Sequence, residues 1–249
     1  MLAVATALAV LIGAVLGMLG GGGSVLMVPV LLYLVGLKPK TALATSQILL
    51  AVTSAVAVMV HIRARRVVWS TGVLFGAASM LGAYCGGRAA RYVPARLLLL
   101  GFTGLMLLSA AQMLRGRRAA PTQQAEAERD GGRLARGATI GFLTGMLAGM
   151  LGVGGGFLIV PALTLFGLPI EKAVGTSLFV ISLQSLAGSI GYLEHVAVDV
   201  HVVVQLAAAM ALGSIGGGLL SRRLPAALLR RLFAGLLVIV ALFMLLRNL

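Results

Sequence analysis

Two glycine clusters are the residues of this chain with the clearest chemical potential. The first occupies 20–23 and is followed by Ser24, and the second occupies 152–156 with one valine inside it. Glycine leaves helical geometry at low steric cost, so a new helix can begin behind each cluster. The first N–H groups of such a helix have no intrahelical acceptor and attract anions. We therefore expect anion contacts from Gly21, Gly22, Gly23, Ser24, Gly154, Gly155 and Gly156.

Hydroxyl and amide side chains follow each cluster at a similar distance along the chain. The hydroxyls are those of Thr45, Ser46, Thr176 and Ser177. Gln47 follows the first pair, whereas Leu178 follows the second, and Gln184 invites the same argument as Gln47 with less force because it lies two turns further on. These groups can donate hydrogen bonds to an oxyanion. The alternative is close helix packing through small residues, and a helix-to-helix hydrogen bond for the amide.

The titratable residues offer little further chemistry. His61 ends one apolar segment and Tyr192 takes the matching place later in the chain, so each is a candidate for a proton relay. A solvated helix end is the simpler explanation of both. The six acidic residues lie in a hydrophilic stretch or near segment ends, which argues against an intramembrane protease or a metal-cation site. We expect no catalysis, no metal and no cofactor.

Composition identifies the elements that must position these groups. The chain is 60% hydrophobic and 10% charged, too few polar residues to cover a surface in water. Apolar runs such as 2–19, 41–61, 69–87 and 95–114 approach the roughly 20 residues of a spanning helix. The net charge of +14 comes from basic residues between apolar segments, which favours a topology signal over nucleic-acid binding. We predict an all-α integral membrane protein in contact with the lipid bilayer.

An internal repeat organises the chain. Residues 13–29 and 145–161 are identical at 10 of 17 positions at an offset of 132. After a one-residue deletion the offset of 131 continues to the end, where it pairs Gly82 with Gly213. We predict a first membrane repeat at 1–114, a hydrophilic cytoplasmic linker at 115–136 and a second repeat at 137–249.

The segment lengths predict the orientation of the two repeats. Each repeat divides into five apolar segments, giving eight to ten membrane segments, and the second segments (24–36 and 156–167) are too short to cross. If the first two fold back as a pair, three crossings follow and the second repeat inserts upside down. This topology places 14 of the 20 Lys and Arg residues on one side and 6 on the other. Even, parallel repeats are the alternative.

The doubled motifs GGGGSVLMVP at 20–29 and GVGGGFLIVP at 152–161, each followed by a Thr-Ser pair, resemble the sulfite exporter TauE/SafE family of permeases. The resemblance covers nearly the whole chain except the linker. It implies a multi-pass protein of the bacterial inner membrane that moves small anions such as sulfite, sulfoacetate or other organosulfonates. With the repeat, it predicts alternating access around a midplane site. The alternatives are a permease for another small solute and a membrane assembly protein without transport.

Overall fold

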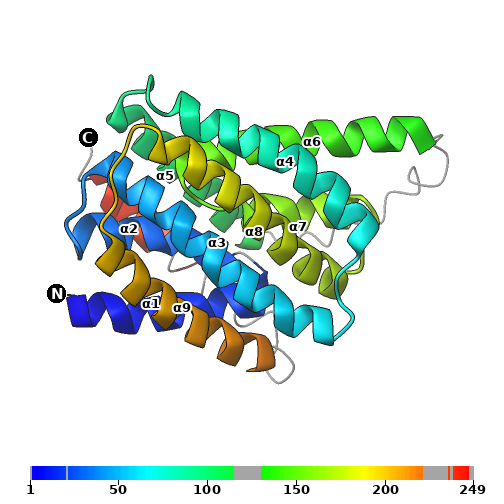
Figure 1. Cartoon of the computed structure of the whole chain (residues 1–249), viewed down its shortest axis with the longest axis horizontal. Helices are drawn as coiled ribbons and strands as arrows, with labels where there is room; N and C mark the ends of the chain where they lie inside the picture. The colour runs from blue at the N-terminus through cyan, green and yellow to red at the C-terminus, as the bar shows by residue number, and fades with distance from the viewer. Residues whose placement is uncertain (1, 21, 115–129, 221–234, 236–237, 247–249) are drawn as a thin grey trace.

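The computed structural model describes residues 2–20, 22–114, 130–220, 235 and 238–246. Every regular element among these residues is helical, which confirms the all-α prediction. Figure 1 shows the long helices packed side by side along one common direction. The helices are α1 (Leu2–Leu19), η1 (Gly22–Leu26), α2 (Met27–Tyr33), α3 (Pro39–Arg63), α4 (Trp69–Ala89), α5 (Ala95–Leu114), α6 (Asp130–Leu151), α7 (Gly156–Leu165), α8 (Ile170–Leu193) and α9 (Val200–Leu220). Residues 238–246 are also helical.

Four of these helices are long and apolar enough to cross a membrane. They are Pro39–Arg63, Leu134–Leu151, Ile170–Leu193 and Val200–Leu220. Large apolar side chains such as Leu81, Val204 and Leu212 are exposed on the outside of the bundle, as expected where lipid replaces water. The number of membrane segments beyond these four stays a prediction.

The two halves exchange partners in the bundle. α1 of the first half packs against α9 of the second, and α6 of the second half packs against α4 of the first. Equivalent glycines make both contacts possible. A Cβ on Gly13 would collide with the carbonyl oxygen of Met210, and a Cβ on Gly145 would collide with that of Ser79. Small residues thus allow the same close backbone approach at both interfaces.

α3 and α8 occupy matching places in the two halves and cross at the centre of the bundle. Gln47 lies against Gly188, whereas the backbone of Arg66 lies against Gly175, so residue numbers rise along one helix as they fall along the other. α3 and α8 therefore run in opposite directions, as Figure 1 shows by their colours.

The short elements follow the glycine clusters. Gly20 has a left-handed backbone (φ 69°), after which η1 returns along α1, so that a Cβ on Gly23 would lie 2.7 Å from the carbonyl oxygen of Ile12. Gly152, Gly154 and Gly155 are left-handed before α7. Only glycine takes this conformation without steric cost, which explains why the chain reverses at these points.

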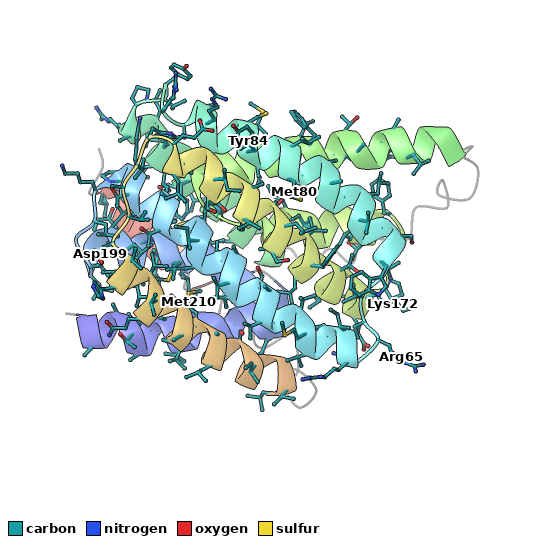
Figure 2. All side chains as sticks on the ribbon, viewed as in Figure 1. Arg65, Met80, Tyr84, Lys172, Asp199 and Met210 are labelled. Carbon is teal, nitrogen blue, oxygen red and sulfur yellow. The ribbon has the colours of Figure 1, made fainter. Side chains whose placement is uncertain are left out.

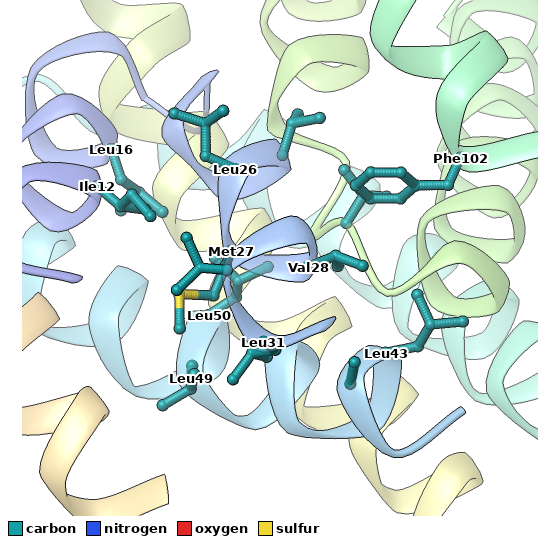
Figure 3. Packing of buried hydrophobic residues seen from close by; sticks show 14 of the residues in the cluster. Ile12, Leu16, Leu26, Met27, Val28, Leu31, Leu43, Leu49, Leu50 and Phe102 are labelled. Atoms are coloured by element: carbon teal, nitrogen blue, oxygen red, sulfur yellow. The ribbon is translucent and has the colours of Figure 1, made fainter. Parts of the chain in front are cut away.

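The apolar core lies around the short helix α2. Met27 and Leu31 of α2 are fully buried, and Figure 3 shows them between the side chains of α1 and those of Leu49 and Leu50 on α3. Lipid cannot supply a hydrophobic driving force between helices, so this tight packing is what holds α2 in place.

The bounds of the linker and of the two repeats stay a prediction. Residues 115–129 lie outside the described residues, but α6 begins at Asp130, seven residues before the predicted start of the second repeat. Gly131 and Gly132 do not prevent this start, and the first turns of α6 project beyond the neighbouring helices in Figure 1.

Candidate functional site

The first glycine junction, residues 20–24, has a lining whose hydroxyls are paired. Ser177 Oγ on α8 lies 2.7 Å from the carbonyl oxygen of Gly20 and 2.8 Å from that of Val174, and it can donate to either. Thr176 Oγ1 accepts from the backbone N–H of Val68 at 3.0 Å. Ser24 is buried, Gly22 is the first residue of η1, and Gly21 lies outside the described residues.

On α3, the two residues that the offset of 131 pairs with Gln184 and Ser185 are hydrogen-bonded within their own helix. Thr53 Oγ1 donates to the carbonyl oxygen of Leu49 at 2.7 Å, and Ser54 Oγ donates to that of Leu50. Both bonds stay within one helix, so these hydroxyls offer no free proton to a ligand.

The second glycine junction, residues 152–156, is lined by α8 at the start of α7. Gln184 Nε2 donates to the carbonyl oxygen of Gly154. A Cβ on Gly155 would lie 2.7 Å from Gln184 Nε2, and a Cβ on Gly154 would lie 2.8 Å from Leu50 Cδ1 and 3.3 Å from Ser185 Oγ. The absence of a side chain at Gly155 lets the amide of Gln184 reach the backbone, and Ser185 Oγ lies beside Gly154 without bonding to it.

Gln47 ties three helices together beside this junction. Its Nε2 donates to the carbonyl oxygen of Ala148 at 2.8 Å and lies 3.2 Å from that of Gly149, both at the end of α6. A Cβ on Gly188 of α8 would lie 3.1 Å from the same nitrogen. Gln47 therefore makes the helix-to-helix hydrogen bond weighed for it, and one half of its amide is used in the fold.

The second junction differs from the first in the polar atoms that it leaves without a partner. Five buried side chains of α3 and α8 carry an oxygen with no hydrogen bond among the described residues. They are Thr45 Oγ1, Ser46 Oγ, Gln47 Oε1, Gln184 Oε1 and Ser185 Oγ. None of the five residues is more than 1% exposed. Leaving a buried polar group unpaired costs about 1–3 kcal/mol, so such a cluster needs a reason.

Ser185 is the residue that sequence reasoning missed. It stands beside Gln184, and the offset of 131 pairs it with Ser54. The signal that could have found it is its adjacency to Gln184, whose counterpart in the first half is Thr53.

The two relay candidates do not meet. His61 Nδ1 lies 3.1 Å from the carbonyl oxygen of Ala57, and Tyr192 donates to that of Met150. They lie near the C-terminal ends of α3 and α8, which run in opposite directions, so they are at opposite ends of the bundle. Within the described part of the chain, no three His, Cys, Asp or Glu side chains are grouped as a metal site.

Charged side chains gather at the two ends. Figure 2 shows Arg65 and Lys172 at one end and Asp199 at the other. Arg66 and Glu171 lie 3.8 Å apart at the first end. At the other end Glu194 lies 3.3 Å from Arg88 Nε and accepts from Tyr84 at 2.7 Å. These pairs leave the middle of the bundle to uncharged polar groups.

His195 at the same end as Glu194 has a lowered pKa. Partial burial of the ring is the main cause, because it disfavours the charged form, and the positive charges of Lys40 and Arg91 add to it. The negative charge of Glu194 opposes the shift. The ring is therefore neutral at pH 7.

The chain matches one protein family and several curated proteins. The profile of the family described as "Sulfite exporter TauE/SafE" matches residues 5–244. A "Probable membrane transporter protein" of Xylella fastidiosa (strain Temecula1) is 35% identical over 243 residues, covering 96% of this chain and 92% of that protein. "Probable membrane transporter protein YunE" of Bacillus subtilis is 28% identical over 258 residues, covering 94% and 90%.

A more distant relative is "Probable membrane transporter protein MJ0441" of Methanocaldococcus jannaschii, 26% identical over 196 residues, covering 75% of this chain and 72% of that protein. No solved structure matches the chain with significance.

Proposed function

We propose a transport function from one premise: this chain belongs to the sulfite exporter TauE/SafE family. It is a multi-pass membrane protein of that transporter family. Its substrates in our proposal are small anions such as sulfite, sulfoacetate or other organosulfonates. The membrane is the bacterial inner membrane.

The cluster of unpartnered polar atoms at the second junction carries this proposal. Ser185 and Ser46 each hold a buried hydroxyl that can donate a hydrogen bond to an oxyanion. Ser185 Oγ is 3.3 Å from the place of a Cβ on Gly154, two residues before α7 begins. The helix dipole favours a negative charge at the start of α7, where the N–H of Leu158 already donates to the carbonyl oxygen of Gly155 and the N–H groups before it are the candidates for a ligand. Hydroxyls and N–H groups together suit an oxyanion.

The proposed mechanism is alternating access between two inverted repeats. The opposite directions of α3 and α8 support inversion, and so does the exchange of partners between the α1–α9 and α6–α4 contacts. Inverted-repeat transporters place substrate near the midplane against discontinuous helices. In our proposal the second junction is that place, with Gln47 and Gln184 beside it.

Flux into liposomes tests the proposal directly. The purified protein, reconstituted without other proteins, is expected to move ³⁵S-labelled sulfite or organosulfonate down a gradient. Gly154→Leu should abolish the flux when compared at equal amounts of folded protein in the membrane, because its Cβ alone would lie 2.8 Å from Leu50 Cδ1 and 3.3 Å from Ser185 Oγ. If the native chain gave no flux of any labelled anion, the result would contradict the proposal and favour a membrane assembly protein.

Cysteine labelling tests the inversion separately. Arg65 and Asp199 are exposed at opposite ends of the bundle (Figure 2), and Cys85 is replaced by alanine to remove the native thiol. Arg65→Cys should react with an impermeant maleimide from the cytoplasmic side and Asp199→Cys from the other. Labelling of both from one side would exclude inverted insertion.

A further inference from the structure

The uncharged lining of the second junction specifies more than an anion. We infer that its ligand is a small oxyanion with one net negative charge that also carries a hydrogen-bond donor, such as a hydroxyl group or a protonated oxygen. This inference rests on the transport function proposed above and narrows its substrates. It follows from the charge of the lining and from the two kinds of unpartnered atom in it.

The charge limit comes from the groups that surround the junction. Ser185, Gln184 and Gln47 are all uncharged, and all are at most 1% exposed. In the described part of the chain, no buried residue is Lys or Arg. The start of α7 supplies the equivalent of about half a positive charge. A single negative charge can be matched by this end and by hydroxyl dipoles, but the cost of burying a charge rises with its square.

The need for a donor comes from the amide oxygens. Nε2 of Gln47 faces the carbonyl oxygen of Ala148, and Nε2 of Gln184 faces that of Gly154, which only an N–H can meet. Each Oε1 is therefore directed elsewhere, and each is buried without a partner among the described residues. A carbonyl oxygen can only accept, so a ligand that donates would pair it.

The hydroxyls supply the opposite half of the recognition. Ser46 and Ser185 can donate to the oxygens of a sulfonate or sulfite group. A ligand with acceptor oxygens at one end and a hydroxyl donor at the other pairs with the serine hydroxyls and with one of the two amide oxygens. Sites that hydrogen-bond a ligand hydroxyl reject the analogue that lacks it, because their own polar groups then stay unpaired.

Three probes of similar size separate these features. In liposomes that take up ³⁵S-labelled 2-hydroxyethanesulfonate, unlabelled ethanesulfonate differs from the substrate only by the missing hydroxyl, and sulfate carries two charges. We expect 2-hydroxyethanesulfonate to compete about tenfold better than ethanesulfonate, the effect of one hydrogen bond, and sulfate to compete least. Equal competition by the two sulfonates, or strong competition by sulfate, would overturn the inference. The absence of uptake of every sulfonate would instead count against the transport function.

Variants of the second junction test whether its residues cause the preference for a ligand hydroxyl. Gln184→Thr gives the second half the residue of the first and removes one of the two amide oxygens, so it should reduce the preference for the hydroxyl while uptake remains. Ser185→Ala should weaken both sulfonates equally, because its hydroxyl meets the oxyanion end. Ser54→Ala is the matched control, since Ser54 Oγ already donates to Leu50 in its own helix. An unchanged hydroxyl preference in folded Gln184→Thr would contradict the assignment.

Discussion

The two glycine junctions have the same architecture and different chemistry. Gly20 lies against Val174 and Gly152 lies against Leu43, and the offset of 131 pairs these two partners. Ser177 at the first junction is paired, as are Thr53 and Ser54, the repeat equivalents of Gln184 and Ser185. Beside the second junction, Ser46, Gln47, Gln184 and Ser185 each keep an unpartnered oxygen. Both halves thus keep the backbone break, and in the described part of the chain these unpartnered oxygens lie beside the second junction. Substitutions can test the shared backbone break and the differing polar groups separately.

The largest effect should come from filling the shared break. Gly20→Ala and Gly152→Ala each force a side chain into left-handed backbone and against neighbours within 3.0 Å. The backbone costs about 1–3 kcal/mol and the overpacking about 1–3 kcal/mol more, so both variants should lose similar stability. Thermal unfolding of the purified proteins measures the loss.

Gly36→Ala is the control for this pair. Gly36 is also left-handed (φ 80°), but a Cβ there has no neighbour within 4 Å, so only the backbone cost remains. If Gly20→Ala were as stable as Gly36→Ala while Gly152→Ala were not, the junctions would not share an architecture.

Gly154→Ala should next distinguish the junctions by activity. Its Cβ would lie 2.8 Å from Leu50 Cδ1 and 3.3 Å from Ser185 Oγ, so it displaces the hydroxyl proposed to bind substrate. The loss of one or two hydrogen bonds corresponds to roughly a 10- to 100-fold fall in kcat/KM. Proteoliposome flux measures it, with Gly104→Ala as control because that site is open. A similar flux for both variants, at equal protein content, would remove Gly154 from the site.

Gln47→Leu should have a smaller and more specific effect. It gives the first half the residue that the second has at Leu178 and removes the amide that contacts Ala148. We expect KM to rise about tenfold, the value of one hydrogen bond, with little change in kcat. Thr53→Val, whose hydroxyl is bound to its own helix, should leave KM unchanged. Equal KM values for both variants would mean that Gln47 serves packing alone.

The sequence reached the shared architecture more easily than the difference. Identical residues at a fixed offset reveal the duplicated glycines without any knowledge of packing, and the apolar runs predict the helices. Whether a hydroxyl is paired depends on which backbone segment packs against it in the folded protein. Ser46 and Ser177 are equivalent in the repeat, yet only Ser177 donates to a glycine carbonyl. Gln184 lies two turns beyond the Thr-Ser pair along α8, but the chain reversal at Gly154 brings the backbone of the second junction against it.

The smallest effect concerns an end of the bundle where the halves also differ. His195 is matched by Ala64, and its pKa is lowered by burial first and by Lys40 and Arg91 next. The unfolded chain therefore binds a proton, near pH 6.5, before the folded chain does. Stability is complete above this pH and should fall as the pH drops towards 5.

His195→Ala copies the first half and should flatten this dependence, measured by the melting temperature at pH 7.5 and pH 5. His201→Ala serves as the control because His201 is an exposed histidine at the start of α9. If His195→Ala kept the full fall in melting temperature, the proton would bind elsewhere. The pH dependence of stability would then reveal no difference between the two halves. The difference between them would be confined to the second junction.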